Sequence, residues 1–113
     1  MTAQEEISLK YRKKWLKMLK EVCLNYIDRD KYAVFLFGSA VSDILRANDV
    51  DIGVLGRKEL PQNIKSVIYN VVEESVIPFR IDIVDFHVAG KRFKKIALSS
   101  IKVWNKPGHI KLN

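Results

Sequence analysis

Three short runs of β-branched and aromatic residues constrain the fold more than any other feature of the chain. They read YAVFLF at 32–37, VDIGVL at 50–55 and RIDIVDF at 80–86. Each run is shorter than an ordinary helix, and glycine, proline or an asparagine–aspartate pair lies close to each one, so we predict three strands. A shorter fourth strand is expected at 101–104, on an edge of the sheet.

The segments between these runs have the periodicity of amphipathic helices. Apolar residues recur three and four apart over about 5–29, and the clearest pattern follows Pro61, which suits the first turn of a helix. That pattern consists of Ile64, Val67, Ile68, Val71 and Val72. Shorter helices are expected at 39–46, with Ser39 as the N-cap, and at 91–98. The alternation predicts an α/β or α+β fold in which helices pack on a small mixed β-sheet.

The size of the chain limits it to one hydrophobic core. It has 113 residues, of which 48% are hydrophobic, so we expect residues 1–113 to form a single domain. No apolar run approaches the roughly 20 residues of a membrane span, and residues 1–20 are too charged for a signal sequence, so a soluble cytoplasmic protein is expected. Cys23 is the only cysteine, which excludes an internal disulfide and a cysteine-based metal cluster within one chain.

The chain carries an excess of positive charge. Its 20 Lys plus Arg against 13 Asp plus Glu give a net charge of +7, which would attract nucleic acid, nucleotides or an acidic protein. Five lysines follow helical spacing on one side of the first predicted helix: Lys10, Lys13, Lys14, Lys17 and Lys20. This basic stripe is either a solvated face or a dock for an acidic partner or a phosphate backbone.

Asp49 and Asp51 are the strongest candidates for a metal site. Residues two apart in a strand project from the same face, so the two carboxylates would lie side by side, while Val50, Ile52 and Val54 would face the core. Two like charges this close favour a cation, and Mg²⁺ is bound by one or two carboxylates together with phosphate and water. The pair therefore predicts a metal with a phosphate ligand, although an aspartate that begins a strand also suits a plain turn or cap.

Gly38 and Ser39 are the candidate phosphate-binding residues. They follow the first predicted strand and begin a helix, where free backbone N–H groups and the helix dipole favour an anion. Glycine allows a phosphate to approach the backbone closely, and Ser39 adds a hydroxyl donor. The structural alternative for Ser39 is an N-cap without a ligand.

A third carboxylate is expected on the strand predicted at 80–86, because two-metal phosphoryl transfer uses a further acidic residue. Asp82 and Asp85 lie three apart and therefore face opposite sides of a regular strand. We choose Asp82, which has an apolar residue on each side, as Asp51 does. Asp85 is expected near the strand end, exposed or salt-bridged, and an ion pair with Arg80 or a lysine is the structural alternative for Asp82.

The segments FLFGSAVSDILRANDVDIGVL and RIDIVDF together resemble the minimal nucleotidyltransferases of the DNA polymerase β-like superfamily. The resemblance covers about residues 32–86. It implies that Gly38 and Ser39 hold a nucleoside triphosphate, that Asp49 and Asp51 bind two Mg²⁺ ions, and that Asp82 is the third catalytic aspartate and metal ligand.

The resemblance also implies a reaction and a partner. AMP would be transferred from ATP to a hydroxyl, and pyrophosphate would leave. Minimal nucleotidyltransferases are commonly the antitoxins of all-helical HEPN ribonuclease toxins, and some adenylylate a tyrosine of the toxin. We expect this partner because the residues after the third predicted strand are too few to form an acceptor-binding domain.

Two departures from the family pattern support a second hypothesis. Nine residues separate Ser39 from Asp49 where the family commonly has about ten, and Ser42 and Asp43 stand where many members carry another glycine. The alternative is a module of the same fold, weak or inactive in catalysis, that neutralises its partner by binding alone. An RNA-directed nucleotidyltransferase would use the basic residues, but it is less favoured because no RNA-binding domain is visible.

Overall fold

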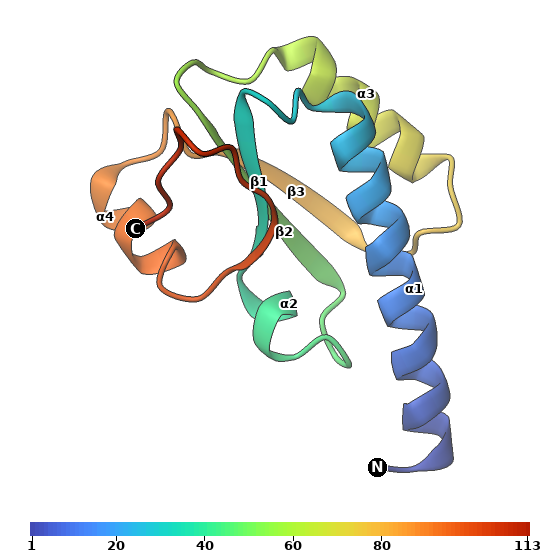
Figure 1. Cartoon of the computed structure of the whole chain (residues 1–113). Helices are drawn as coiled ribbons and strands as arrows, with labels where there is room; N and C mark the ends of the chain where they lie inside the picture. Colours follow the sequence, from blue (N-terminus) through green and yellow to red (C-terminus); the bar gives the residue numbers. More distant parts are fainter.

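The computed structural model describes residues 1–113 as four helices and four strands (Figure 1). In chain order they are α1 (Ala3–Tyr26), β1 (Tyr32–Phe37), α2 (Ser39–Ser42), β2 (Asp49–Gly56), α3 (Gln62–Glu73), β3 (Arg80–Asp85), α4 (Lys91–Ala97) and β4 (Lys102–Asn105). The strands form one mixed sheet with helices on both of its faces, so the predicted α/β class is confirmed.

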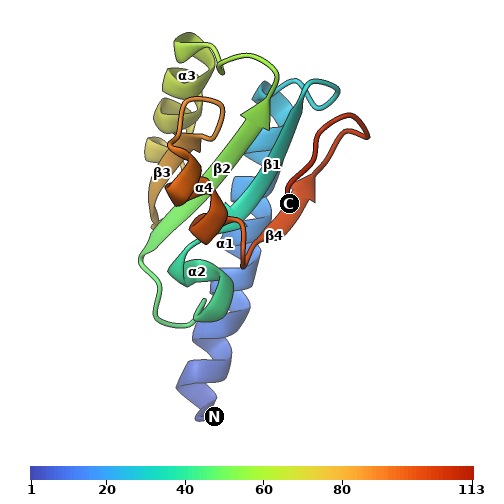
Figure 2. The same cartoon turned by 90° about the vertical axis from the view of Figure 1, so that its left-hand side faces the viewer.

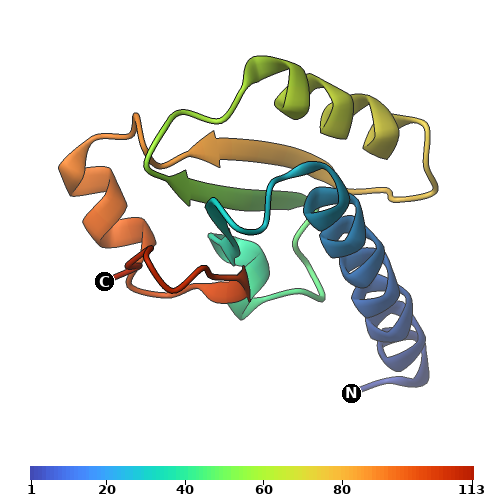
Figure 3. The same cartoon turned by 45° about the horizontal axis from the view of Figure 1, so that its top comes forward.

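The sheet has the strand order β3-β2-β1-β4. β1 pairs antiparallel with both β2 and β4, whereas β2 and β3 are parallel and are joined through α3. Helices α1 and α3 cover one face, and α4 and the C-terminal segment lie against the other (Figure 3). β3 and β4 are the two edge strands (Figure 2).

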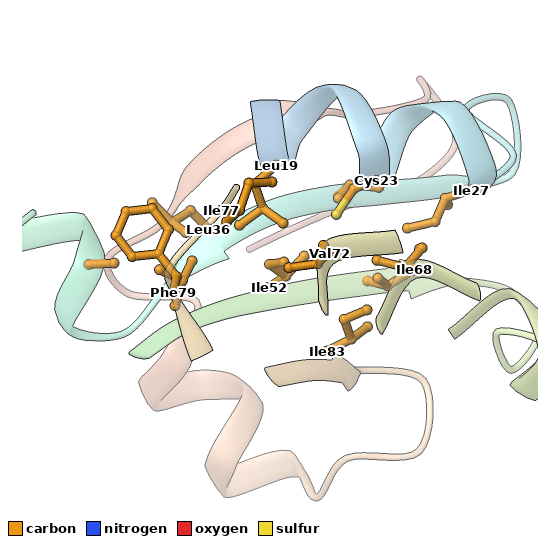
Figure 4. Packing of buried hydrophobic residues seen from close by; sticks show 14 of the residues in the cluster. Leu19, Cys23, Ile27, Leu36, Ile52, Ile68, Val72, Ile77, Phe79 and Ile83 are labelled. Atoms are coloured by element: carbon orange, nitrogen blue, oxygen red, sulfur yellow. The ribbon is translucent and has the colours of Figure 1, made fainter. Parts of the chain in front are cut away.

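The larger hydrophobic core lies between the sheet and the helices α1 and α3. Leu19 and Cys23 of α1 and Ile68 of α3 are fully buried and point toward Ile52 of β2 (Figure 4). Each buried aliphatic side chain of this size contributes roughly 1.5–3 kcal/mol by leaving water. This core fixes the face of β2 that carries Val50, Ile52 and Val54, and it therefore directs Asp49 and Asp51 to the opposite face.

A smaller aromatic core occupies that opposite face. Phe86 packs edge-on against Phe35 and Phe37, with ring centroids 4.9 and 5.2 Å apart, and Ile110 and Leu112 of the C-terminal segment cover them. All six residues of β1 are buried, three toward each core. This explains why the run at 32–37 is continuously apolar instead of alternating.

Cys23 lies in the larger core, and burial raises the pKa of its thiol to about 12. Because only the thiolate reacts with disulfide reagents, we predict that a thiol-specific disulfide reagent labels the native protein at least about a hundredfold more slowly than the protein in urea. The measurement is the labelling rate as a function of urea concentration. Rapid labelling without denaturant would show that α1 does not stay packed on the sheet.

Most predicted boundaries agree with the structure to within one or two residues, but α1 is displaced towards the N-terminus. It begins at Ala3 because Thr2 and Glu5 form a capping box, in which Thr2 Oγ1 accepts the Glu5 N–H at 3.1 Å. It ends at Tyr26, before the predicted end at residue 29, because Ile27 is extended. Neither α1 nor any other helix is long and apolar enough to cross a membrane.

Candidate active site

The strand register brings the predicted aspartates to one face of the sheet. Asp51 of β2 is the direct partner of Asp82 on β3, and Asp49 is the partner of Arg80. Neighbouring strands lie about 4.8 Å apart, so Asp51 and Asp82 are adjacent side chains on the face away from α1 and α3. Sequence reasoning places Asp49 and Asp51 on this face by their spacing, and the parallel pairing adds Asp82.

The cluster is electrostatically unfavourable without a counter-charge. Partial burial raises the pKa of the Asp51 carboxyl, and the negative charges of Asp82 and Asp49 raise it further. No lysine or arginine forms an ion pair with Asp51 or Asp82. A divalent cation between the carboxylates would relieve this repulsion, because an opposite charge favours the ionised form.

Asp49 is less closely joined to the cluster than the other two aspartates. Its Oδ1 atom lies 3.9 Å from Arg80 Nε, and both side chains are largely exposed. The three carboxylates are not gathered into a ready three-ligand group. The donor set nevertheless fits Mg²⁺, because all of its atoms are carboxylate oxygens on one exposed face. The ion pair between Asp49 and Arg80 is at the surface and therefore weak, so a metal ion can displace Arg80.

Gly38 closes the other side of the site. It links β1 to α2 with φ 77° and ψ −159°, a backbone conformation that is essentially restricted to glycine. A Cβ atom on Gly38 would collide with Asp51 Oδ2. Position 38 therefore requires glycine for two reasons, which are the backbone conformation of the turn and the close contact of the Asp51 carboxylate.

The prediction of a helix at 39–46 with Ser39 as its N-cap is wrong. α2 is a single turn, Ser39–Ser42, in which Gly38 is the N-cap and Ser39 is the first helical residue. The helix stops at Asp43, whose backbone has left the helical region, with φ −141° and ψ 72°. The Ser39 side chain is exposed and forms no hydrogen bond, so its hydroxyl is free for a ligand.

Arg12 of α1 fixes the segment between α2 and β2, a role that sequence reasoning missed. Its guanidinium donates to the carbonyls of Ile44 and Ala47, at 3.2 and 2.6 Å, and to Asn48 Oδ1 at 3.3 Å. It also lies over the Phe79 ring, 5.8 Å from the centroid. These contacts hold the backbone immediately before Asp49. No local pattern identifies them, because the partners are more than thirty residues away in the sequence.

We predict that Arg12→Met lowers the stability of the protein by about 1–2 kcal/mol, because hydrogen bonds from a charged donor are lost while the aliphatic stem is retained. The measurement is urea unfolding, together with hydrogen exchange of the 43–48 amides, which should become faster. Lys14→Met on the same helix is the control and should have little effect. Equal stability of the two variants would contradict the anchoring role.

Tyr69 of α3 covers the open edge of β3 beside Asp82. Its hydroxyl accepts the Ile83 N–H at 2.8 Å and lies 3.5 Å from Asp82 Oδ1, to which it is a donor. Burial is the main cause of its raised pKa, and the nearby Asp82 contributes. Tyr69 therefore remains a neutral donor and limits the movement of the Asp82 carboxylate.

Asp85 does not have the environment that the sequence suggested. It is at the end of β3, but it is half-buried and forms no salt bridge. Its two oxygens accept the backbone N–H groups of Leu60, at 2.7 Å, and His87, at 2.9 Å. Asp85 therefore holds the segment before α3 against the end of β3, and the expectation of an exposed or salt-bridged residue is wrong.

A cavity of about 330 Å³ lies between β3 and the start of α3 and has Asp82 in its wall. Gln62, Lys65 and Val84 also line it. The cavity adjoins the carboxylate cluster at the edge of the sheet, so a molecule bound there would present its groups to Asp82.

Comparisons with known proteins identify the family and the fold of the chain. The sequence matches the family described as "Polymerase beta, Nucleotidyltransferase" over residues 17–106. No curated protein sequence matches the chain significantly. Among solved structures, a complex of the tri-AMPylated Shewanella oneidensis HEPN toxin with its MNT antitoxin matches with a TM-score of 0.61 and 17% identity, over 82% of this chain and 71% of that chain.

Two further structures give similar values. A double mutant of the MntA–HpeT toxin–antitoxin complex matches with a TM-score of 0.63 and 17% identity, over 83% of this chain and 74% of that chain. A toxin–antitoxin complex with AMP-PNP matches with a TM-score of 0.62 and 19% identity, over 78% and 70%. At these identities the likeness shows the fold, which is that of MNT antitoxins. Because the family match extends over most of its length, the chain belongs to the polymerase beta nucleotidyltransferase family.

Proposed function

We propose that the protein transfers AMP from ATP to a hydroxyl of a partner protein. The observation that carries this proposal is the pairing of Asp51 with Asp82 across parallel strands, with the Gly38 backbone packed against Asp51. A carboxylate cluster beside an exposed turn of N–H groups suits a triphosphate and its metal ions. Membership in a nucleotidyltransferase family makes nucleotidyl transfer the reaction that this chemistry serves best.

Each residue has a distinct part in the proposed reaction. The N–H groups of Ser39 and Ala40 and the free hydroxyl of Ser39 orient the phosphates, because the first N–H groups of a helix have no acceptor within it. Asp49 and Asp51 would hold the triphosphate-bound Mg²⁺, and Asp82 would join them at a second ion. Bound Mg²⁺ supplies charge neutralisation and a lower pKa for the attacking hydroxyl.

The acceptor is proposed to approach from the β3 edge. Asp82 is the aspartate at this edge and lines the cavity between β3 and α3, so an acceptor hydroxyl that enters there meets Asp82 before the other two carboxylates. The hydroxyl of Tyr69 holds the Asp82 carboxylate from the same side. This geometry separates the acceptor, at the sheet edge, from the phosphates, at Gly38.

The partner that we propose is a HEPN toxin, with a tyrosine as the acceptor and with this chain as the antitoxin. The support is the fold shared with MNT antitoxins, one of which was solved with a tri-AMPylated HEPN toxin. A tyrosine suits the reaction because its long side chain carries a hydroxyl that can reach the cavity next to Asp82. We expect a HEPN reading frame beside the gene for this chain.

The direct test mixes the purified protein with that HEPN protein, ATP and Mg²⁺, and follows the mass of the HEPN protein. We expect its mass to increase by one or more adenylyl groups, and tandem mass spectrometry should locate each group on a tyrosine. Asp49→Asn is the matched variant and should leave the mass unchanged. A mass that stays constant with wild-type protein would overturn the enzymatic proposal.

One observation favours neutralisation by binding alone. Asp49 faces Arg80 instead of its neighbouring aspartates, and α2 is only one turn long, so the site has fewer preformed ligands than its sequence pattern suggests. Calorimetric titration with ATP and Mg²⁺ distinguishes the two functions. A binding module should release little heat, whereas a transferase should bind the nucleotide only when the metal is present.

A further inference from the structure

The largest cavity described for the molecule lies away from the candidate active site, between α1 and β4. Its volume is about 500 Å³. Four of its eight lining residues are lysines and none is acidic: Lys13, Lys17, Lys20 and Lys102. Three of these belong to the basic stripe of α1, whereas Lys10 and Lys14 do not line the cavity. The structure therefore divides the stripe into a grooved part and a solvated part.

The floor of this groove is apolar. Leu36 of β1 is buried at its base, Leu16 of α1 is half-buried on one side, and Val103 and Trp104 of β4 form the other side. A groove with an apolar floor and lysine walls matches a ligand that carries both apolar groups and negative charges.

The groove is on the opposite side of the sheet from the aspartates. Leu36 and Lys102 are register partners on the face that α1 covers, whereas Asp51 pairs with Phe37 on the other face. The groove also lies at the β4 edge, and Asp82 lies at the β3 edge. A ligand held in the groove would leave the active site open.

We propose that this groove binds an acidic amphipathic helix of a partner protein. Helices α1 and α3 form a layer on this face, and β4 lies at the edge of the sheet next to α1 (Figure 2). A third helix in the groove would extend that layer over β4. Lys13 and Lys20 are about 10 Å apart along α1, so roughly two turns of the incoming helix contact the lysines.

The groove suits a polypeptide better than a nucleic acid. Single-stranded nucleic acids are bound through aromatic rings with a free face, and the only ring here, Trp104, is packed against the larger core. The aliphatic side chains of Leu16 and Leu36 instead provide an apolar surface for leucine-like side chains. The carboxylates of the helix would then pair with the surrounding lysines, as in helix-in-groove recognition.

The test is an NMR titration of the ¹⁵N-labelled full chain, without ATP or Mg²⁺, so its outcome is independent of the proposed catalysis. The probe is a short synthetic helix with leucines on one face and glutamates on the other. We expect the largest shifts at the Leu16 and Val103 amides and at the Trp104 indole N–H. A peptide with lysines in place of the glutamates should cause no shifts.

Two charge-reversal variants make the test specific. Lys17→Glu combined with Lys102→Glu should weaken peptide binding at least about tenfold, whereas Lys10→Glu combined with Lys14→Glu should change it by less than about threefold, because equal charge is reversed outside the groove. The dispersion of the spectra shows that each variant is folded. Absence of binding, equal weakening in both variants, or preferential binding of a uridine oligonucleotide in the groove would overturn the proposal.

Discussion

Asp51→Asn should strongly reduce nucleotidyl transfer and at the same time stabilise the metal-free protein. The transfer rate should fall by about a thousandfold, because the metals supply several kcal/mol of charge stabilisation in such reactions. Stability should rise because burial and two neighbouring carboxylates raise the pKa of Asp51 in the folded state. At neutral pH the folded protein therefore carries an unfavourable charge that asparagine removes.

The direction of the Asp51 pKa shift determines how the stability gain of Asp51→Asn depends on pH. A carboxyl whose pKa is raised in the folded state does not destabilise the protein at a pH below its pKa in the unfolded chain. Stability is lost as the pH rises from there through the pKa of the folded state. The advantage of Asp51→Asn should thus be present at pH 7 and disappear at strongly acidic pH. Because Asp51 is only partly buried, we expect a Tm increase of about 2–4 °C, or roughly half a kcal/mol.

The measurement is thermal unfolding in the presence of a chelator, repeated across this pH range, together with the transfer assay. Asp30→Asn is the control, since Asp30 is exposed and its side chain makes no ion pair. It should alter neither activity nor Tm appreciably. An Asp51→Asn protein that is less stable than wild type at every pH would show that the three carboxylates do not repel one another in the folded protein.

Gly38→Ala should damage both the fold and the nucleotide site. Alanine is strained at φ 77° and ψ −159°, which costs about 1–3 kcal/mol, and its Cβ would displace the Asp51 carboxylate. We expect a corresponding loss of stability in urea and a decrease in transfer rate of about a hundredfold or more, since a misplaced ligand of this kind costs roughly that factor.

The chain provides a matched glycine for comparison. Gly90 has φ −65°, and a Cβ added to it would meet no atom within 4 Å. Gly90→Ala should therefore be close to neutral, because alanine reduces the freedom of the unfolded chain but is a poorer N-cap of α4 than glycine. Ser39→Ala should keep full stability and lose only nucleotide affinity. If Gly38→Ala changes stability and transfer rate no more than Gly90→Ala does, Gly38 is not closely packed against Asp51.

The elements that sequence predicts well are those decided by local pattern. β1 agrees with its predicted bounds because a continuous apolar run is typical of a strand buried on both faces. The helix α3 is confirmed because its apolar residues repeat at helical spacing, although Val67 of that pattern is exposed. The helix predicted at 39–46 is too long, because Asp43 leaves the helical conformation and Arg12 of a distant helix binds the carbonyls of the loop that follows.

The candidate site likewise combines features that follow from the local sequence with features that depend on tertiary packing. The shared face of Asp49 and Asp51 follows from the two-residue period of a strand, which is a local property. The pairing of Asp51 with Asp82 depends on how α3 returns the chain beside β2, which no residue pattern determines. The contacts of Tyr69 with Ile83 and Asp82 and the two backbone bonds of Asp85 are likewise products of tertiary packing. The metal-binding and catalytic roles of Asp49, Asp51 and Asp82 remain predictions.

Crystals grown with Mn²⁺ and a non-hydrolysable ATP analogue test the central claim most directly, because Mn²⁺ replaces Mg²⁺ and gives an anomalous signal. We predict anomalous peaks between the carboxylates of Asp49, Asp51 and Asp82, with the triphosphate over Gly38 and Ser39. Asp49 should have left Arg80. Nucleotide bound at another surface, or Mn²⁺ without contact to Asp51, would contradict the assignment of this site.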